Sequence, residues 1–193
     1  MASDDGIIGR LYSLFKKRTV NAVPVQPEKL VHFSDPLGNF ELDIPEGWSF
    51  DRDVIVDSGQ YSISFEAPDR RVRFVVSVDT KPPKPADFQA YVKKECEGPA
   101  SGILCGMVKE AFRDYPGFGR RFVFGKGNDE SVMEDRIFLT AGAVFTLSMT
   151  YPVMKANAQK KDEGKALLDR MLASFVIHKG IMLRELRDDK EFR

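Results

Sequence analysis

Residues 38–50, GNFELDIPEGWSF, decide the fold class of this chain. Phe40, Leu42 and Ile44 alternate with two acidic residues, which is the period-two pattern of a strand with one buried face. The acidic positions belong to the solvent side of the same strand. The stretch therefore predicts a sheet that covers a core on one side only, as antiparallel sheets commonly do.

The chain's only tryptophan follows directly after the break in this strand. Pro45 has no backbone N–H to donate to a ladder, so it predicts the end of the strand. Gly47 allows a sharp turn. We expect Trp48 to fold back over the end of the sheet as part of the core, with stacking on a ligand as the alternative.

Further runs with period two extend the sheet. Alternation over 61–67 and 72–78, separated by Pro68-Asp69, predicts a hairpin. A second pair of strands is predicted over 131–140 and 143–151, joined at Ala141-Gly142. No strand–helix–strand unit repeats along the chain, which favours an antiparallel sheet packed by helices over a parallel one.

Two helices are predicted within this sheet protein. Pro85 suits the first turn of a helix that ends near Gly98. Apolar residues at helical spacing predict another helix around 166–175. Residues 100–116 are compatible with either helix or strand.

Composition limits the classes of function. The chain has 193 residues, of which 42% are apolar and 30% charged, and its 29 basic residues balance its 29 acidic ones. This composition predicts one packed domain and disfavours a globally basic nucleic-acid binder, so no nucleic-acid partner is expected. Cys96 and Cys105 match no metal or redox motif, and we expect reduced thiols, with a disulfide between them as the alternative.

The N-terminal region differs from the rest of the chain. Residues 1–31 combine an apolar stripe at helical spacing with a cluster of basic residues and a linker containing Pro24 and Pro27, which predicts a short amphipathic helix. Its apolar stripe requires a surface: its own domain, a partner protein, or an anionic membrane. The predicted membrane or partner contacts are Ile7, Ile8, Arg10, Leu11, Leu14, Phe15, Lys16, Lys17 and Arg18.

The motif "NFELDIPEGWSF", together with the later phrases "ADFQAYV" and "RMLASFVI", resembles the pattern of PsbP-like domains. The similarity covers about residues 32–178, which leaves 1–31 as helix and linker and 179–193 as a charged tail. The resemblance implies an antiparallel sheet flanked by helices on both faces, an α/β/α sandwich in the α+β class. The family includes photosystem accessory proteins and Ran-release factors, and its members are mostly binding or assembly proteins, not enzymes.

No set of residues in the chain predicts catalysis. His32 and His178 flank the domain and could approach each other, but we expect ordinary boundary residues, because no metal-ligand spacing surrounds them. No nucleophile motif is present, so we predict no catalytic residue, metal or cofactor. The segment 117–124, GFGRRFVF, is similar to an RNA-binding octamer, yet its phenylalanines are expected to pack in a core.

Arginines provide a second candidate contact surface. If their strands are neighbours, Arg71, Arg73, Arg120 and Arg121 form a basic patch on one sheet face, which would suit an acidic partner. The alternative is a set of solvated arginines on an open face.

The sequence therefore predicts a non-catalytic protein-binding or assembly module, held at a membrane surface by its N-terminal helix. A cytoplasmic location peripheral to a membrane is expected, with the thylakoid lumen as the alternative if the chain is a processed form. The alternative function is a small-ligand or lipid carrier, with a cleft floored by Phe74, Phe122 and Phe145.

Overall fold

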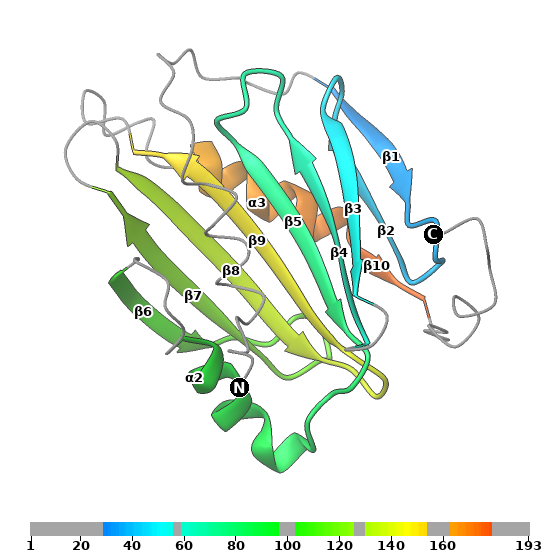
Figure 1. Ribbon diagram of the computed structural model, residues 1–193, viewed down its shortest axis with the longest axis vertical. Helices are drawn as coiled ribbons and strands as arrows, with labels where there is room; N and C mark the ends of the chain where they lie inside the picture. Colours follow the sequence, from blue (N-terminus) through cyan, green and yellow to red (C-terminus); the bar gives the residue numbers. More distant parts are fainter. Residues whose placement is uncertain (1–28, 56–58, 97–102, 126–129, 154–162, 179–193) are drawn as a thin grey trace.

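The computed structural model describes residues 29–55, 59–96, 103–125, 130–153 and 163–178. These residues form two antiparallel sheets and two α-helices (Figure 1). The larger sheet has seven strands, in the spatial order β3 (Ser49–Ile55), β4 (Gln60–Glu66), β5 (Arg73–Asp79), β9 (Val144–Pro152), β8 (Ser131–Leu139), β7 (Gly117–Phe124) and β6 (Ile103–Lys109).

The smaller sheet has three strands, in the order β1 (Leu30–Ser34), β2 (Phe40–Pro45) and β10 (Val176–Ile177). Its strands come from opposite ends of the domain, because β1 and β2 open the described chain and β10 closes it. Among the described residues, no helix is long and apolar enough to cross a membrane.

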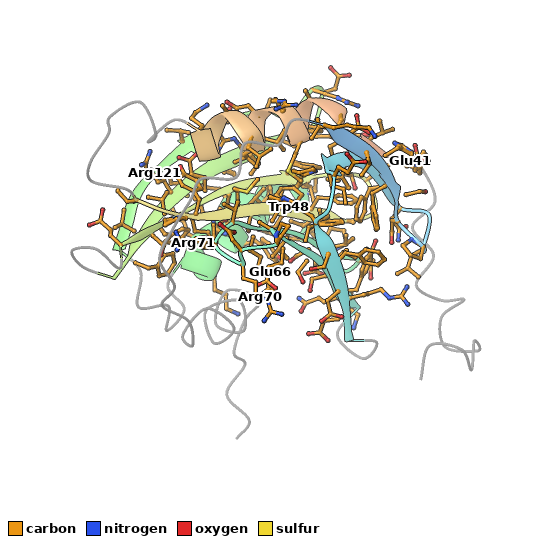
Figure 2. The ribbon with its side chains drawn as sticks, turned by 90° about the horizontal axis from the view of Figure 1, so that it is seen from above. Glu41, Trp48, Glu66, Arg70, Arg71 and Arg121 are labelled. Atoms are coloured by element: carbon orange, nitrogen blue, oxygen red, sulfur yellow. The ribbon has the colours of Figure 1, made fainter. Side chains whose placement is uncertain are left out.

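The main core lies on one face of the seven-stranded sheet, which we call the first face. Helix α3 (Glu163–Ser174) covers it together with the inner side of the smaller sheet, as Figure 2 shows from above. The ring of Phe175, which follows α3, stacks on Phe40 at 5.3 Å and meets Phe145 edge-on at 5.9 Å. One aromatic cluster therefore joins the helix and both sheets.

The alternation of each strand accounts for this core. In β4, Tyr61, Ile63 and Phe65 are buried on the first face, and the residues between them are only half-buried on the other. Strand β2 buries Phe40, Leu42 and Ile44 in the same way against α3 and the sheet. The antiparallel α+β class predicted from residues 38–50 is thereby confirmed.

Helix α2 (Phe88–Cys96) follows a 3-10 turn, η2 (Pro85–Asp87), and packs at one end of the opposite face, which we call the second face. Phe88 meets Phe118 of β7 at 5.6 Å. Within the described ranges, α2 is the only helix on this face, and Figure 1 shows it at the lower end of the sheet. Helical cover of the second face is thus local.

Both predicted hairpins are confirmed, since β4 pairs with β5 and β8 with β9. The undecided segment 100–116 contains strand β6 and a tight turn closed by the bridge between Phe112 and Tyr115. The sequence prediction missed β1, β3 and β10. Strand β3 reads SFDRDVI, where charged residues interrupt the apolar pattern, and β10 has two residues.

The turn after β2 has the predicted form. Gly47 adopts φ +82°, a left-handed conformation that favours glycine, and the Trp48 amide donates to the carbonyl of Pro45 at 3.3 Å. Trp48 is 8% exposed and belongs to the main core, as predicted. Its indole Nε1 has no hydrogen-bond partner among the described residues.

Candidate functional site

The second face is the candidate site, because polar side chains replace the apolar ones that fill the first face. Directly opposed residues in antiparallel strands point to the same side of a sheet, so the pairing register assigns each side chain to a face. One row across this face runs, from β3 to β7, through Asp51, Ser64, Val75, Ser148, Asp135 and Arg120. A neighbouring row runs through Ser49, Glu66, Arg73, Thr150, Met133 and Phe122.

A buried ion pair lies next to α2 on this face. Arg120 Nη2 donates to Asp135 Oδ2 at 2.7 Å, and both side chains are 1% exposed. Arg120 Nη1 also donates to the Val92 carbonyl of α2 at 3.4 Å, and its guanidinium lies 5.4 Å from the ring centre of Phe122. These contacts compensate the burial of the guanidinium and attach α2 to the sheet.

A second polar contact holds the other side of α2. The hydroxyl of Tyr91 donates to Asp79 Oδ2 at 3.0 Å, and Asp79 Oδ1 accepts from the Lys81 amide at 2.8 Å. Strand β5 ends at Asp79, so this carboxylate ties the helix to the loop that leads into it. The position of α2 is therefore fixed by polar contacts as well as by the packing of Phe88.

Three buried oxygen atoms on the second face remain without a hydrogen-bond partner among the described residues: Ser77 Oγ, Thr150 Oγ1 and Asp135 Oδ1. Each of these residues is less than a tenth exposed. Buried polar atoms in folded proteins nearly always have a partner, and each unsatisfied atom is costly. Asn39 Oδ1 and Trp48 Nε1 also lack a described partner, but the second face carries its three oxygens on the neighbouring strands β5, β9 and β8, which indicates a surface suited to polar contacts.

Carboxylates dominate the outer part of the face, away from α2. Asp51 and Asp53 are exposed on the edge strand β3, and Glu66 lies opposite Arg73 in the β4–β5 pair. Burial lowers the pKa of Arg73, and the nearby charges of Glu66 and Asp51 partly restore it. The outer part of the second face therefore carries three carboxylates around Arg73, and Arg70 of the β4–β5 turn lies beside Glu66 (Figure 2).

The four arginines of the predicted basic patch are not brought together. Strands β5 and β7 are separated by β9 and β8, so the condition that these strands be neighbours is not met. Arg120 is buried against Asp135, whereas Arg121 points to the first face and pairs with Glu134 at 3.2 Å. Arg71 lies near Asp69 in the β4–β5 loop.

The three phenylalanines that were predicted to floor a carrier cleft do not lie on one face of the sheet. Phe74 and Phe145 are fully buried on the first face, and Phe122 lies on the second. A small open pocket of about 80 Å³ lies instead between α3 and β7–β8, near Glu110 and Arg136. Ligand sites are usually several times larger.

The remaining predicted site residues fall into two groups. The N-terminal helix and all of its proposed contacts, from Ile7 to Arg18, lie outside the described residues, as do the side chains of Cys96 and Cys105. His32 and His178, by contrast, are brought together around Glu41, at 3.6 and 3.2 Å. Among the described residues, no group of three or more His, Cys, Asp or Glu side chains is arranged to hold a metal ion.

The sequence prediction did not single out Asp135, Ser77 or Thr150. A usable signal was present, because the predicted strand 131–140 contains Glu134, Asp135 and Arg136 in succession. Strands with three consecutive charged residues cannot keep both faces apolar, and one charge must be buried or paired if helices cover the sheet. The row of hydroxyls on β5 and β9 becomes visible only when the register is known.

Comparison with solved structures finds several chains of similar fold. PsbP (CyanoP) from Synechocystis sp. PCC 6803 matches with a TM-score of 0.54 at 15% identity, over 82% of this chain and 98% of that one. The Ran-binding protein Mog1p of Saccharomyces cerevisiae matches with a TM-score of 0.48 at 13% identity, over 77% of this chain and 95% of that one. A protein from Bacteroides thetaiotaomicron gives 0.47 at 20% identity, over 77% of this chain and 48% of that one, so this chain spans about half its length.

No protein-family model matches the chain, and no curated protein is detectably similar to it in sequence. The likeness to solved structures, at these identities, concerns the fold. The chain has the PsbP-like fold, and the resemblance seen around residues 38–50 is confirmed at that level.

Proposed function

We propose that the chain is a non-catalytic module that binds a protein partner through the second face of its seven-stranded sheet. The observation that carries this proposal is the group of buried, unpartnered oxygens of Ser77, Thr150 and Asp135 on that face. A partner that offers N–H or O–H donors would satisfy such atoms, and a partner contact of this kind stabilises more than it costs.

The charge on the outer part of the second face indicates what charge the partner should carry. Asp51, Asp53 and Glu66 outnumber Arg73 there, so complementary charge on a partner would be basic. This reverses the acidic partner expected from the arginines, because Arg120 is neutralised internally and Arg121 lies on the first face. The accessory and binding roles associated with the PsbP-like fold agree with a protein partner.

A pull-down from native extract at low salt tests the proposal when it compares two charge-reversal variants. Asp53→Lys changes the outer part of the second face, and Asp114→Lys makes the same change in net charge in the β6–β7 turn, where Asp114 is also exposed. We expect salt-sensitive capture by the natural chain and by Asp114→Lys, and loss of that capture in Asp53→Lys. Equal capture by both variants would place the contact elsewhere.

The amphipathic helix predicted for the N-terminal region is a second element of the proposal, and we propose that it attaches the chain to an anionic membrane surface at the cytoplasmic side. Its support is the sequence of residues 7–18, in which an apolar stripe is accompanied by Arg10, Lys16, Lys17 and Arg18. Co-sedimentation with neutral and anionic vesicles tests it, using the full chain and a chain that lacks residues 1–20. Sedimentation of the full chain alone, and with anionic vesicles alone, is expected; no sedimentation would remove the tether.

A further inference from the structure

The smaller sheet brings the chain's only two histidines to one carboxylate. His32 lies on β1 and His178 directly after β10, and these strands flank β2 on opposite sides. His32 Nε2 is 3.6 Å from Glu41 Oε2, and His178 Nε2 is 3.2 Å from Glu41 Oε1. His32 Nδ1 also lies 3.3 Å from Asp43 Oδ1.

This cluster lies on the outer side of the smaller sheet, away from the core. Phe40, Leu42 and Ile44 point inward from β2, so Glu41 and Asp43 between them point outward. Both carboxylates and both imidazoles are partly exposed, although His178 Nε2 itself is buried and its contact with Glu41 is an ion-pair distance without hydrogen-bond alignment. Figure 2 shows Glu41 at the margin of the molecule, on the side of β1.

The histidines face few other charged groups on the three strands of the smaller sheet. Strands β1, β2 and β10 contain no lysine or arginine, and Glu41 and Asp43 are their only carboxylates. The nearest basic residue along β1, Lys29, pairs with Glu46 at 3.0 Å in the turn after β2. The two histidines are therefore the only groups on these strands that can compensate the charge of Glu41 and Asp43.

The arrangement does not suit one shared metal ion. His32 lies opposite Asp43, whereas the His178 amide donates to the Asn39 carbonyl, four residues away along β2. The imidazoles consequently approach Glu41 from opposite ends, and the ligands of one tetrahedral ion must converge within a few ångströms. Each imidazole can instead take up its own proton and pair with Glu41 from its own side.

We propose that Glu41 and its two histidines form a proton-dependent clamp that holds the first and last strands of the domain onto β2. Histidine changes its charge in the range between pH 5 and 8. The protonated imidazole is attracted to Glu41 and Asp43, whereas the neutral one leaves the two carboxylates without a compensating charge. The ion pairs that hold β1 and β10 onto β2 exist only while the imidazoles are protonated, so we expect these contacts to weaken as the pH rises.

The clamp controls the two places where the domain meets the ends of the chain. Strand β1 follows residues 1–28 and β10 precedes residues 179–193. Release of either strand would change how these segments leave the domain, and release of β1 would also withdraw Phe33 from its contacts with Phe50 and Phe65. The clamp is independent of the second face, so its failure would leave the proposed partner contact untouched.

Amide hydrogen exchange of the full chain at pH 6 and pH 8, corrected for the intrinsic rate, tests the clamp. Exposed ion pairs contribute modestly, so we expect the opening of β1 and β10 to be about two- to fivefold more frequent at pH 8. Strands β5 and β9 should show no such change. Glu41→Gln should remove the pH dependence of β10 and weaken that of β1, where the contact between His32 and Asp43 remains.

Glu46→Gln is the matched control, because Glu46 pairs with Lys29, whose charge does not change between these pH values. It should loosen β1 equally at both pH values and keep the pH dependence. His32→Gln and His178→Gln separate the two halves, acting on β1 and β10 respectively. Protection that is independent of pH in the natural chain, or a pH dependence of β10 that persists unchanged in Glu41→Gln, would overturn the proposal.

Discussion

The two faces of the seven-stranded sheet differ in what their side chains require. The first face is filled by rings and branched aliphatic groups that pack against α3 and the smaller sheet. The second face carries hydroxyls and charges, and it is packed by α2 at one end. The comparison shows how one sheet can serve both stability and binding. Burial of apolar groups on the first face stabilises the fold, and this offsets the cost of buried polar atoms without partners on the second face.

Buried polar groups occur on both faces of the sheet, but they differ in how many hydrogen-bond partners they have. Next to the first face, Asp35 accepts from the Tyr61 hydroxyl at 2.8 Å and from the Asn39 amide at 3.1 Å, and Tyr61 in turn accepts from Asn39 Nδ2. This network joins the β1–β2 turn to β4 and leaves the carboxylate well satisfied. In that network one atom, Asn39 Oδ1, lacks a described partner, whereas on the second face one oxygen of Asp135 and two hydroxyls lack one.

The largest effect is expected for Phe145→Ala on the first face. Phe145 is fully buried, stacks on Phe138 at 5.5 Å and meets Phe175 edge-on. Removal of such a ring leaves a cavity and should lower the free energy of unfolding by about 3–5 kcal/mol, measured by urea unfolding. A loss below about 1 kcal/mol would mean that the first face is not the main core.

Arg120→Met should be nearly as damaging, although it changes the second face. The substitution leaves the Asp135 carboxylate buried without its cation, and we expect a loss of about 3 kcal/mol. The double variant Arg120→Met, Asp135→Leu is the control, since it removes both charges. It should be more stable than Arg120→Met alone; an equal or lower stability would show that the pair does more than compensate burial.

Tyr61→Phe should cost about 1–3 kcal/mol near neutral pH, because Asp35 loses a buried donor. Burial raises the pKa of Tyr61, and the charge of Asp35 raises it further. In the unfolded chain tyrosine loses its proton near pH 10, so the folded state becomes less stable as the pH rises above about 10.

This contribution amounts to about 1.4 kcal/mol per pH unit for one tyrosine, and it should disappear in Tyr61→Phe. Urea unfolding of both proteins between pH 9 and 11 measures it, and the other tyrosines provide a common background. The same alkaline slope in both proteins would contradict the buried position of this hydroxyl.

Ser77→Ala should have the smallest effect on stability. The Ser77 hydroxyl is buried but has no described partner, so its removal should change the free energy of unfolding by less than about 0.5 kcal/mol, or raise it. Under the proposed function, the same variant should bind the partner more weakly. Ser174→Ala is a useful contrast, because Ser174 Oγ accepts from the Asp43 amide and donates to the Met171 carbonyl.

Much of the first face could be predicted from the sequence, because its strands alternate clearly and its turns carry Pro, Gly and Asp at the expected places. Strand β3 could not, since its charged residues conceal the period, and β1 and β10 are held by partners from the other end of the chain. The pattern of arginines suggested a patch, but the order of strands placed two other strands between Arg73 and Arg120. The site depends on register and on strand order, and neither is encoded within a single segment.

Carboxyl footprinting with a carbodiimide, before and after addition of the captured partner, tests the central claim most directly. If the second face is the binding surface, Asp51 and Asp53 should become protected from carbodiimide labelling when the partner binds. Asp114 in the β6–β7 turn and Glu46 beside Lys29 should keep their reactivity. Protection of Asp114 or Glu46 with unchanged labelling of Asp51 and Asp53 would contradict the assignment of the second face as the binding surface.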